Sequence, residues 1–359
     1  MMRLSRNKCV RWLLWTGLLL PMALVVGCRK ASKEPETEGI NIIFSADCQW
    51  LEENGRREMS SALARFDEIH AVYAHNDPQA HGAYLAALAE GRGREKTIKF
   101  IGIDALPHEG VTYVKQGILT ATFQYPTGGK DAIDIGIKIL KGEEVPKWIT
   151  LGTRLFTKEN VDKGGVEIAA KGPKRAGLKA DKPRPSKKLA EGKKVVFGMS
   201  QCNLAEPWRV QMNDDIREQA KKYPEIQLLE KDAQNDVTVQ QSHVREFLTQ
   251  GIDLLIVSPK ETVPMTRPVK EVYESGIPVI VLDREVQGTS FTCFIGGDNV
   301  LIGREAGKHL ASLLNGNGKV VELQGLMTSE PGVDRHEGFL QGLREYAEEH
   351  KTPQEGAGE

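Results

Sequence analysis

Short apolar runs alternate with amphipathic stretches along most of this chain, and the alternation stops once, near the middle. The run at residues 279–282 (V-I-V-L) is typical of a buried strand, and residues 263–275 have the apolar spacing of a helix. About ten or eleven strands can be placed in this way, in two series. Strands that alternate with helices favour mostly parallel sheets covered by helices on both faces. We therefore expect an α/β protein.

The interruption covers residues 158–193. Gly, Pro, Lys and Ala recur there without apolar periodicity, as in G-P-K-R-A-G-L-K-A-D-K-P-R-P-S-K-K. Such a composition favours a flexible linker over a packed element. We expect residues 158–193 to be a basic, flexible linker between the two series of strands.

The first residues have the pattern of an export signal. Arg3, Arg6 and Lys8 precede an apolar run at residues 12–26, which is too short for a comfortable transmembrane helix. The run closes with V-V-G-C, which resembles the bacterial lipobox, in which the cysteine is lipidated. This pattern predicts a signal peptide at residues 1–27, a lipid on Cys28, a polar tether at 28–39 and a place in the periplasm or cell envelope. An ordinary signal or anchor with a chance cysteine is the alternative.

Composition excludes several other classes of function. The net charge of −1 provides no strong field for nucleic acid. The five cysteines form no CxxC pair or Cys/His cluster, so a structural zinc site is not expected. We expect neither a metal nor a cofactor.

Polar and aromatic side chains gather where the expected strands end. Ligands of open parallel sheets bind just beyond the carboxyl ends of the strands. The candidate binding residues selected in this way are Trp50, Asn76, Asp104, Gln124, Trp208, Arg209, Asp283, Arg284 and Arg335.

A sugar suits this set of side chains. Its ring has apolar faces that pack on aromatic plates, and its hydroxyl groups need carboxylate, amide and guanidinium partners around the edge. Each residue alone could equally be a cap or a turn residue. From the residues alone, the chain has a polar small-molecule cleft.

Several motifs resemble the ribose-type periplasmic sugar-binding proteins. The runs V-V-F-G-M-S-Q, I-P-V-I-V-L-D-R and I-G-G-D-N-V-L-I-G-R-E-A-G are similar to the N-terminal half of that family. The runs H-A-V-Y-A-H-N-D, I-K-F-I-G-I-D and L-T-A-T-F-Q-Y-P are similar to its C-terminal half. The resemblance covers nearly all of residues 40–157 and 194–347. LacI-type repressors share this fold, but they carry a helix-turn-helix and no export signal.

The two halves stand in the opposite order from the family. The resemblance therefore implies a type 1 periplasmic binding protein fold that is circularly permuted, with two Rossmann-like lobes of parallel sheet joined by a hinge. Permutation is tolerated where the old termini can be bridged and the new ones lie in an exposed loop. Two alternatives stay open: a remnant of two tandem binding proteins whose halves pair between chains, and a non-functional fragment.

The resemblance also implies the domain boundaries. One ligand-binding lobe would combine residues 40–124 with 298–347. The other would combine residues 125–157 with 194–297. The linker would join the family's old C-terminus to its old N-terminus.

The same resemblance assigns roles to the candidate residues. Trp50 and Trp208 would sandwich the sugar ring. The residues that would hold its hydroxyl groups are Asn76, Asp104, Gln124, Asp283, Arg284 and Arg335.

This chain departs from the ribose group at two positions of the expected site. Glu206 stands where that group has an Asn, and Arg209 stands where it has a Phe. The second replacement removes an aromatic ring that could stack on a sugar and introduces a positive charge. The pattern is closer to the galactofuranose-binding subgroup and favours a sugar more polar than ribose, such as a hexose, a furanose or a sugar acid. Alternatively, Arg209 pairs with Glu206 and touches no ligand.

The implied function is the delivery of a monosaccharide to an ABC importer, with the chain held to the membrane by its lipid. A receptor that presents the sugar to a membrane sensor kinase or chemoreceptor is the alternative. Asp104 and Asp283 are the candidate paired carboxylates of a glycosidase. Arg284 next to Asp283 favours an ionised carboxylate and not a catalytic acid, so we do not expect an enzyme.

Two cysteines fall in loops at the expected mouth of the cleft. Cys48 and Cys202 belong to different lobes, and export permits disulfides. A bond between them would lock the lobes, which favours two free thiols. Cys293 lies in an apolar run and is expected in the core.

Overall fold

Two separate β-sheets carry the fold. The structure is a computed structural model that describes residues 39–91, 98–169 and 185–350. All these residues belong to one compact unit. The expected α/β architecture with mostly parallel sheets is confirmed.

The first sheet has seven strands in the order β1-β13-β2-β3-β4-β6-β7. Its strands are β1 (Ile40–Asp47), β2 (Ala71–Ala74), β3 (Lys99–Asp104), β4 (Ala121–Gln124), β6 (Thr153–Thr157), β7 (Val166–Ile168) and β13 (Gly318–Gln324). The five strands from β1 to β4 in this order are parallel. β6 and β7 extend the sheet in antiparallel pairing.

The second sheet has six parallel strands in the order β5-β12-β11-β10-β8-β9. Its strands are β5 (Trp148–Leu151), β8 (Val195–Gln201), β9 (Ile226–Asp232), β10 (Leu254–Val257), β11 (Val279–Leu282) and β12 (Cys293–Gly297). β10 and β11 are buried at every residue, as expected of parallel strands that helices cover on both faces. This double burial explains their continuous apolar sequences.

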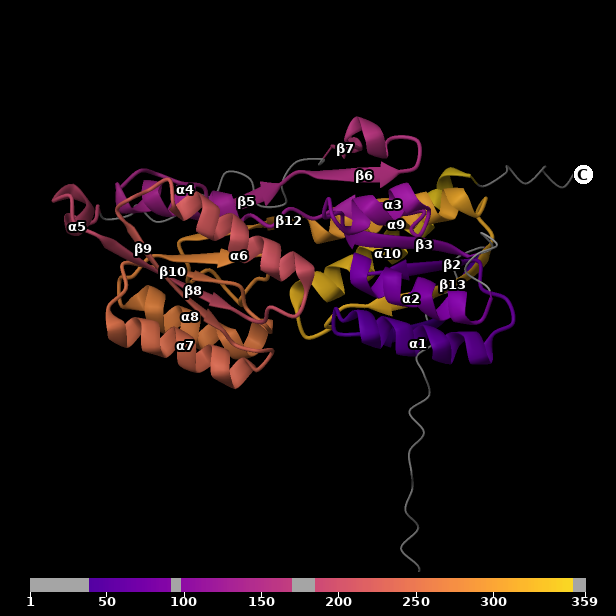
Figure 1. The fold of residues 1–359 in the computed structure, drawn as a ribbon, viewed down its shortest axis with the longest axis horizontal. Helices are drawn as coiled ribbons and strands as arrows, with labels where there is room; N and C mark the ends of the chain where they lie inside the picture. The colour runs from indigo at the N-terminus through magenta and orange to yellow at the C-terminus, as the bar shows by residue number, and fades with distance from the viewer. Residues whose placement is uncertain (1–38, 92–97, 170–184, 351–359) are drawn as a thin grey trace, which may run out of the picture. The chain divides into compact units, whose positions relative to one another are not determined.

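Helices pack on both sheets (Figure 1). Those of the first sheet are α1 (Glu52–Arg65), α2 (Asp77–Ala89), α3 (Gly110–Gln116), α9 (Asn299–Leu313) and α10 (Glu330–Glu349). Those of the second sheet are α4 (Gly129–Leu140), α6 (Pro207–Ala220), α7 (Val237–Gln250) and α8 (Thr262–Glu274). We call the seven-stranded sheet with its helices the first lobe, and the six-stranded sheet with its helices the second lobe.

Most helices begin where a strand has just ended, and local sequence signals fix several of these starts. The side chains of Asn76, Asp236 and Asp298 accept hydrogen bonds from backbone N–H groups in the first turns of α2, α7 and α9. Pro207 occupies the first turn of α6, where its missing N–H costs nothing. The loops that join each strand to the following helix therefore lie at the carboxyl edge of the sheet.

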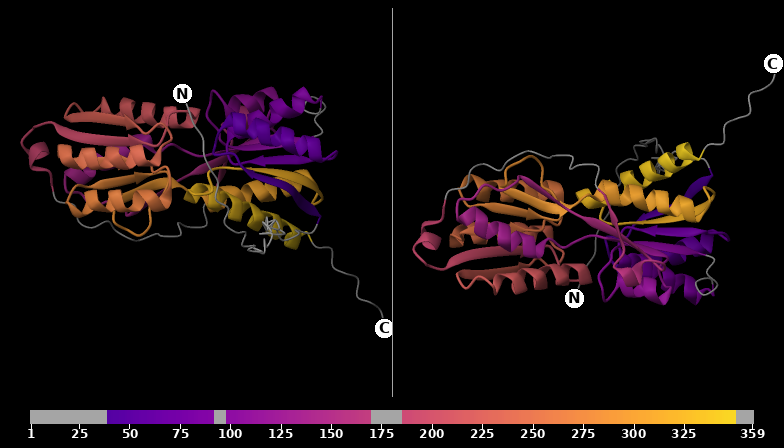
Figure 2. Two further views of the ribbon diagram at one scale, coloured as in Figure 1. Left: turned by 90° about the horizontal axis from the view of Figure 1, so that it is seen from below. Right: turned by 90° about the horizontal axis from the view of Figure 1, so that it is seen from above.

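The first lobe is built from both ends of the chain. β13 lies between β1 and β2, with Ile40 paired to Gly318 and Ala71 paired to Val320. The yellow and indigo segments of Figure 2 accordingly lie side by side.

The chain passes between the two sheets at three short crossings. They are residues 125–128 before α4, Gly152 between β5 and β6, and Asp298 between β12 and α9. We call these the hinge crossings. A longer connection leads from β7 to β8 and includes residues 170–184, which lie outside the described ranges.

The structure corrects the expected boundary at residue 157. Residues 125–157 were expected in the second lobe, but β6 pairs with β4 in the first sheet. The expected linker also contains regular structure: a 3₁₀ turn, η1 (Val161–Lys163), strand β7, and a short helix, α5 (Lys187–Ala190). The sequence signal for β7 was weak because this edge strand pairs only with β6 and none of its three residues is buried.

The expected signal peptide, most of the expected tether and Cys28 lie outside the described residues. Within the described ranges, none of the helices has the length and apolar character needed to cross a bilayer.

Candidate ligand-binding site

A small pocket lies where the strand ends of both lobes meet. Its empty volume is about 270 Å³. The residues that line it are Trp50, Asn76, Asp104, Tyr125, Glu206, Trp208, Arg209, Asp283, Arg284, Pro331 and Arg335. Eight of the nine residues selected from the sequence are among them. Strand-end position was therefore a good guide to which side chains the fold brings together.

Gln124 is the selected residue that does not line the pocket. It is the last residue of β4, and its backbone carbonyl accepts a hydrogen bond of 2.5 Å from the Thr153 hydroxyl. Its neighbour Tyr125 lines the pocket instead. Successive residues of a strand point to opposite faces, so a shift of one residue exchanges the side that faces the ligand.

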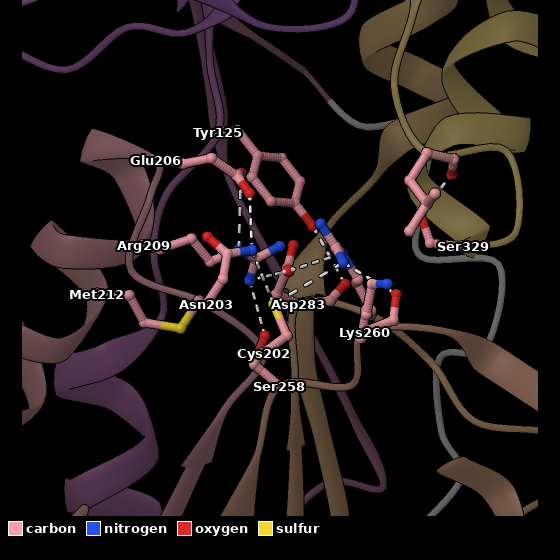
Figure 3. Close-up of polar contacts among 12 residues, drawn as sticks. Tyr125, Cys202, Asn203, Glu206, Arg209, Met212, Ser258, Lys260, Asp283 and Ser329 are labelled. Carbon is pink, nitrogen blue, oxygen red and sulfur yellow. Dashed lines mark hydrogen bonds and ion pairs between the residues drawn. The ribbon is translucent and has the colours of Figure 1, made fainter. Parts of the chain in front are cut away.

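Arg209 connects three elements of the second lobe (Figure 3). Its Nη1 lies 2.6 Å from the Asp283 carboxylate and donates a hydrogen bond of 2.7 Å to the Ser258 hydroxyl. Its Nε lies 3.8 Å from the Glu206 carboxylate. The sequence left open a pairing of Arg209 with Glu206 as an alternative to ligand contact. Arg209 does contact Glu206, but its closer partner is Asp283. Its side chain also lines the pocket. Burial acts to lower the pKa of Arg209, and the charge of Asp283 more than offsets this, so the guanidinium stays charged.

Arg284 and Arg335 complete a set of three buried guanidinium groups. Arg284 donates a 2.9 Å hydrogen bond to the Lys260 carbonyl, and Arg335 donates one of 2.9 Å to the Asn299 amide oxygen. Both guanidinium groups lie over the Trp50 ring, at 5.5 and 5.1 Å from its centroid. Cation–π contacts of this kind hold the ring and both cations in one arrangement.

A buried polar network supports Arg335 from behind. Arg335 donates to the backbone carbonyl of His75, and the Nε2 of His75 lies 3.0 Å from Glu322. His336 lies 2.9 Å from the same carboxylate. Hydrogen bonds from these groups lower the pKa of Glu322 to about 2, against the opposing effect of burial. Burial lowers the pKa of His75, so a neutral ring donates to an ionised carboxylate.

Asp104 faces the pocket from the end of β3. Burial raises the pKa of its carboxyl group well above the usual value, and the charge of Arg335 opposes this. Asn76 also lines the pocket, but its side chain caps α2 and donates a 2.9 Å hydrogen bond to the Trp50 carbonyl. Asn76 therefore has a structural role in addition to any role toward a ligand.

The two tryptophans come from different lobes. Trp50 follows β1, and its ring packs so closely on Gly325 that a Cβ atom there would lie 2.2 Å from the ring. Trp208 lies in α6, and its indole N–H donates a 2.7 Å hydrogen bond to the Tyr125 carbonyl. Both side chains are almost completely buried.

Three pocket residues have strained backbones. Trp50, Asp104 and Asp283 have positive φ angles of 69°, 124° and 71°. Non-glycine residues rarely adopt such angles, and those that do cluster at functional sites, where surrounding contacts hold them. The strained backbone angles therefore support the pocket as the functional site.

Several pocket donors have no hydrogen-bond partner. They are the Nε1 of Trp50 and the Nε atoms of Arg209 and Arg284, all of which are buried. Buried polar atoms normally find partners, because an unpaired donor costs about 1–3 kcal/mol. These three N–H groups, together with the Asp104 carboxyl group, leave the pocket able to bind a ligand with several oxygen atoms.

Three lining residues were not selected from the sequence: Tyr125, Glu206 and Pro331. Glu206 was noted only as a departure from the ribose group. Pro331 lies in the first turn of α10, and Tyr125 directly follows the end of β4. Their positions next to a helix start and a strand end were the sequence signals that could have identified them as pocket residues.

Cysteine and metal chemistry is limited in the described part of the chain. Cys48, Cys202 and Cys293 are free and buried, and neither Cys48 nor Cys202 lines the pocket. Within the described residues, no group of three or more His, Cys, Asp or Glu side chains could hold a metal ion.

Comparison with known proteins assigns the family. A periplasmic binding protein domain matches residues 23–144 and 197–357, which is more than half of the chain. The chain belongs to the periplasmic binding protein family. The homologous segments include both sides of the pocket described above.

Several relatives in this family have named ligands. The ribose import binding protein of Bacillus subtilis is 30% identical over 147 residues, or 41% of this chain and 48% of the relative. The galactofuranose-binding protein of Escherichia coli is 29% identical over 154 residues, or 42% and 48%. The fructose-binding periplasmic domain of a hybrid two-component system is 40% identical over 42% of this chain and 50% of that one, with a TM-score of 0.41. The chain spans about half the length of the curated relatives that it matches.

Proposed function

We propose that this chain is a lipid-anchored, extracytoplasmic binding protein for a monosaccharide, which it delivers to an ABC importer. The observation that carries the proposal is the composition of the pocket. Two tryptophans, three guanidinium groups and three carboxylates from both lobes converge on a volume of about 270 Å³.

The chemistry of the pocket favours a sugar ring. Guanidinium and carboxylate groups bind hydroxyl groups with fixed geometry, and the mixture of both signs suits a ligand without a large net charge. Trp50 and Trp208 would contact the ring, and Asn76, Asp104, Asp283, Arg284 and Arg335 would hold its hydroxyl groups.

Relatives support a sugar as the ligand. The names of the matched curated proteins include ribose, galactofuranose and xylitol. All of these are small polyhydroxylated molecules, and the pocket lining fits that class. Because the two lobes contribute opposite walls, ligand binding and closure of the lobes would be one event.

A binding screen tests the proposal. The chain from Ala31 onward is heated with D-ribose, D-fructose, D-galactose and other pentoses and hexoses, and responders are measured by calorimetry. A ligand at 100 times its dissociation constant should add ~2.7 kcal/mol to folded stability. The response should be lost in Asp283→Asn and kept in Asp214→Asn, which changes an exposed carboxylate outside the pocket. A cooperative melt without any responder would contradict the proposal.

The partner at the membrane needs a separate test. Cross-linking in intact cells, followed by mass spectrometry, should recover an ABC permease. Recovery of a sensor kinase or chemoreceptor instead would show that the protein acts as a sugar receptor and not in import. The proposal that it binds a sugar would not be affected.

Lipidation is proposed at Cys28. The modified chain should partition with membranes and carry a lipid on its N-terminal peptide, and Cys28→Ser should release it to the soluble fraction. A wild-type chain that is soluble after export would contradict the anchor.

We also propose that the two halves are circularly permuted and close on themselves. The start of β1 and the end of α10 meet at the loop between α9 and β13. A Cβ on Gly39 would lie 2.1 Å from the carbonyl oxygen of Gly316, and a Cβ on Gly316 would lie 3.4 Å from the Tyr346 ring. Two chain ends that lie so close could have been continuous in an ancestor. The partial coverage of relatives also agrees with this, since a single collinear alignment can follow only one half.

A rearranged gene tests the permutation. A chain with residues 194–349 placed before residues 39–157, and without the linker, should fold as a monomer and bind the same sugar. Failure of this chain to fold, or a wild-type chain that is an obligate dimer, would favour halves that pair between chains.

A further inference from the structure

Tyr125 contacts both lobes at the point where the chain crosses between them. It is the first residue of the first hinge crossing, directly after β4, and it is almost completely buried. Its aromatic ring and hydroxyl group lie beside the pocket (Figure 3). The ribose-type resemblance assigns no role to this position.

Contacts with the second lobe hold one side of Tyr125. Its hydroxyl donates a hydrogen bond of 3.3 Å to the Asp283 carbonyl, and its own carbonyl accepts the Trp208 indole N–H. The rings of Tyr125 and Trp208 lie 5.3 Å apart. Gly297 makes room for the tyrosine, since a Cβ there would lie 2.5 Å from its ring.

Contacts with the first lobe hold the other side. The Asn299 side chain donates a 3.4 Å hydrogen bond to the Tyr125 hydroxyl. Arg335 lies 4.7 Å from the centre of the ring. The backbone N–H of Tyr125 donates to the Asp104 carbonyl at 3.2 Å. Two pocket residues of each lobe thus contact Tyr125: Arg335 and Asp104 of the first lobe, and Asp283 and Trp208 of the second.

We infer that Tyr125 is a positioning residue that couples occupancy of the pocket to the arrangement of the two lobes. The hydroxyl group is the bridge, because it accepts from Asn299 of the first lobe and donates to Asp283 of the second. A rotation of the lobes about the hinge crossings changes the separation of these two partners, so the bridge exists in one arrangement only. The inference deepens the proposed function and rests on it.

The hydroxyl can serve as this bridge throughout the physiological pH range. Burial raises the pKa of Tyr125 well above its usual value, and the charge of Asp283 acts in the same direction. The phenol therefore keeps its proton and remains a donor. Its partner on Asp283 is the backbone carbonyl of a residue with a positive φ of 71°.

The decisive variant is Tyr125→Phe, which removes the bridge and keeps the ring. Tyr73→Phe is the matched control. Tyr73 is also buried, and its hydroxyl donates a hydrogen bond of 3.3 Å to the Arg335 carbonyl, but both partners lie in the first lobe. Each variant removes one buried hydroxyl with one donated bond of the same length.

The experiment measures lobe separation and binding in the full chain. Spin labels on unnatural amino acids at the exposed positions Glu53 in α1 and Arg267 in α8 report the distance between the lobes. Surface-immobilised protein reports the binding of D-ribose, D-fructose and D-galactose. Tyr125→Phe should broaden the distance distribution of the free protein toward longer values. It should also weaken binding of the responding sugar about threefold to tenfold, through faster dissociation.

The control separates coupling from simple loss of stability. Tyr73→Phe should lower the melting temperature to a similar extent and leave both the distance distribution and the dissociation rate unchanged. Equal distances and rates for the two variants would overturn the inference. If no sugar binds the wild type, the proposed function fails, and the distance measurement still decides whether Tyr125 bridges the lobes.

Discussion

The guanidinium group of Arg209 lies 2.6 Å from the carboxylate of Asp283, and both side chains are almost completely buried. A buried pair of this kind contributes little net stability over an apolar pair, but removal of one partner leaves an uncompensated charge. Asp283 is therefore needed both for a ligand and for the stability of the second lobe.

Asp283→Asn should lower the free energy of unfolding by ~3–5 kcal/mol, because Arg209 loses its ionised partner in a buried site. Asparagine tolerates the positive φ at this position, so backbone strain is not the cause. Urea unfolding followed by circular dichroism measures the change. Asp214→Asn is the control, since Asp214 pairs with Arg217 on the surface and such pairs are worth less than ~1 kcal/mol. Equal losses in the two variants would show that burial of the pair has no effect.

Trp50→Phe should weaken binding of the responding sugar about twofold to tenfold, since it removes part of the aromatic plate and the unpaired indole N–H. Trp148→Phe makes the same change in β5, away from the pocket, and should leave affinity unchanged. Calorimetric titration measures both. An unchanged dissociation constant in Trp50→Phe would remove this residue from the proposed site.

Stability should fall as the pH rises from about 4.5 to about 7, in part because of Glu109. Burial raises the pKa of this carboxyl group to about 7, so the folded chain binds a proton that the unfolded chain has already released. The contribution is at most about 3 kcal/mol. Glu109→Gln should flatten this part of the profile, which is measured by urea unfolding at a series of pH values. A wild-type profile that rises across this range, with no difference in the variant, would contradict the assignment.

Glu322 should have the opposite effect at lower pH. Its pKa is lowered to about 2, so its contribution is fully present above about 4.5 and is lost as the pH falls toward 2. The loss should amount to about 3 kcal/mol. Glu322→Gln should be less stable at neutral pH and less sensitive to acid, whereas the exposed Glu348→Gln should follow the wild type. Parallel acid profiles for all three chains would show that the network around Glu322 is not ionised.

The chain from Ala31 onward should contain three thiols and no disulfide, because Cys48, Cys202 and Cys293 are each free and buried. Alkylation in the folded state should be slow, and burial raises the pKa of Cys48 and Cys293 to about 12, which further suppresses the reactive thiolate. Mass spectrometry before and after denaturation measures the count. A peptide that links Cys48 to Cys202 would show instead that the lobes are locked together.

The fold class and most of the pocket lining could be predicted from the sequence because both depend on the buried parallel strands. Parallel strands buried on both faces, such as β10 and β11, produce continuous apolar runs, and the residues after them are brought to one edge. Arg209 and Arg284 could therefore be placed in a pocket before any contact was known. Their partners Ser258 and Lys260 could not, since a hydrogen bond from a loop leaves no periodic signal.

The features that the sequence did not predict depend on tertiary context. β6 pairs with the edge of the first sheet although β5, two residues earlier, pairs in the second, and both have the same extended pattern. Tyr125 directly follows the end of β4, and its contacts with both lobes arise only when distant segments come together. Local propensity carries no information about which sheet a short strand joins.

The position of β13 between β1 and β2 delays the folding of the first lobe. β1 has no native neighbour until residues 318–324 have been synthesised, so nearly the whole chain must leave the ribosome before β1 can join the sheet. Long-range pairing of this kind is slow, because chain entropy is lost before the contacts form. For a chain that is exported, as we propose, late pairing leaves β1 without its neighbour until synthesis is nearly complete, and a chain in that state is suited to translocation before folding.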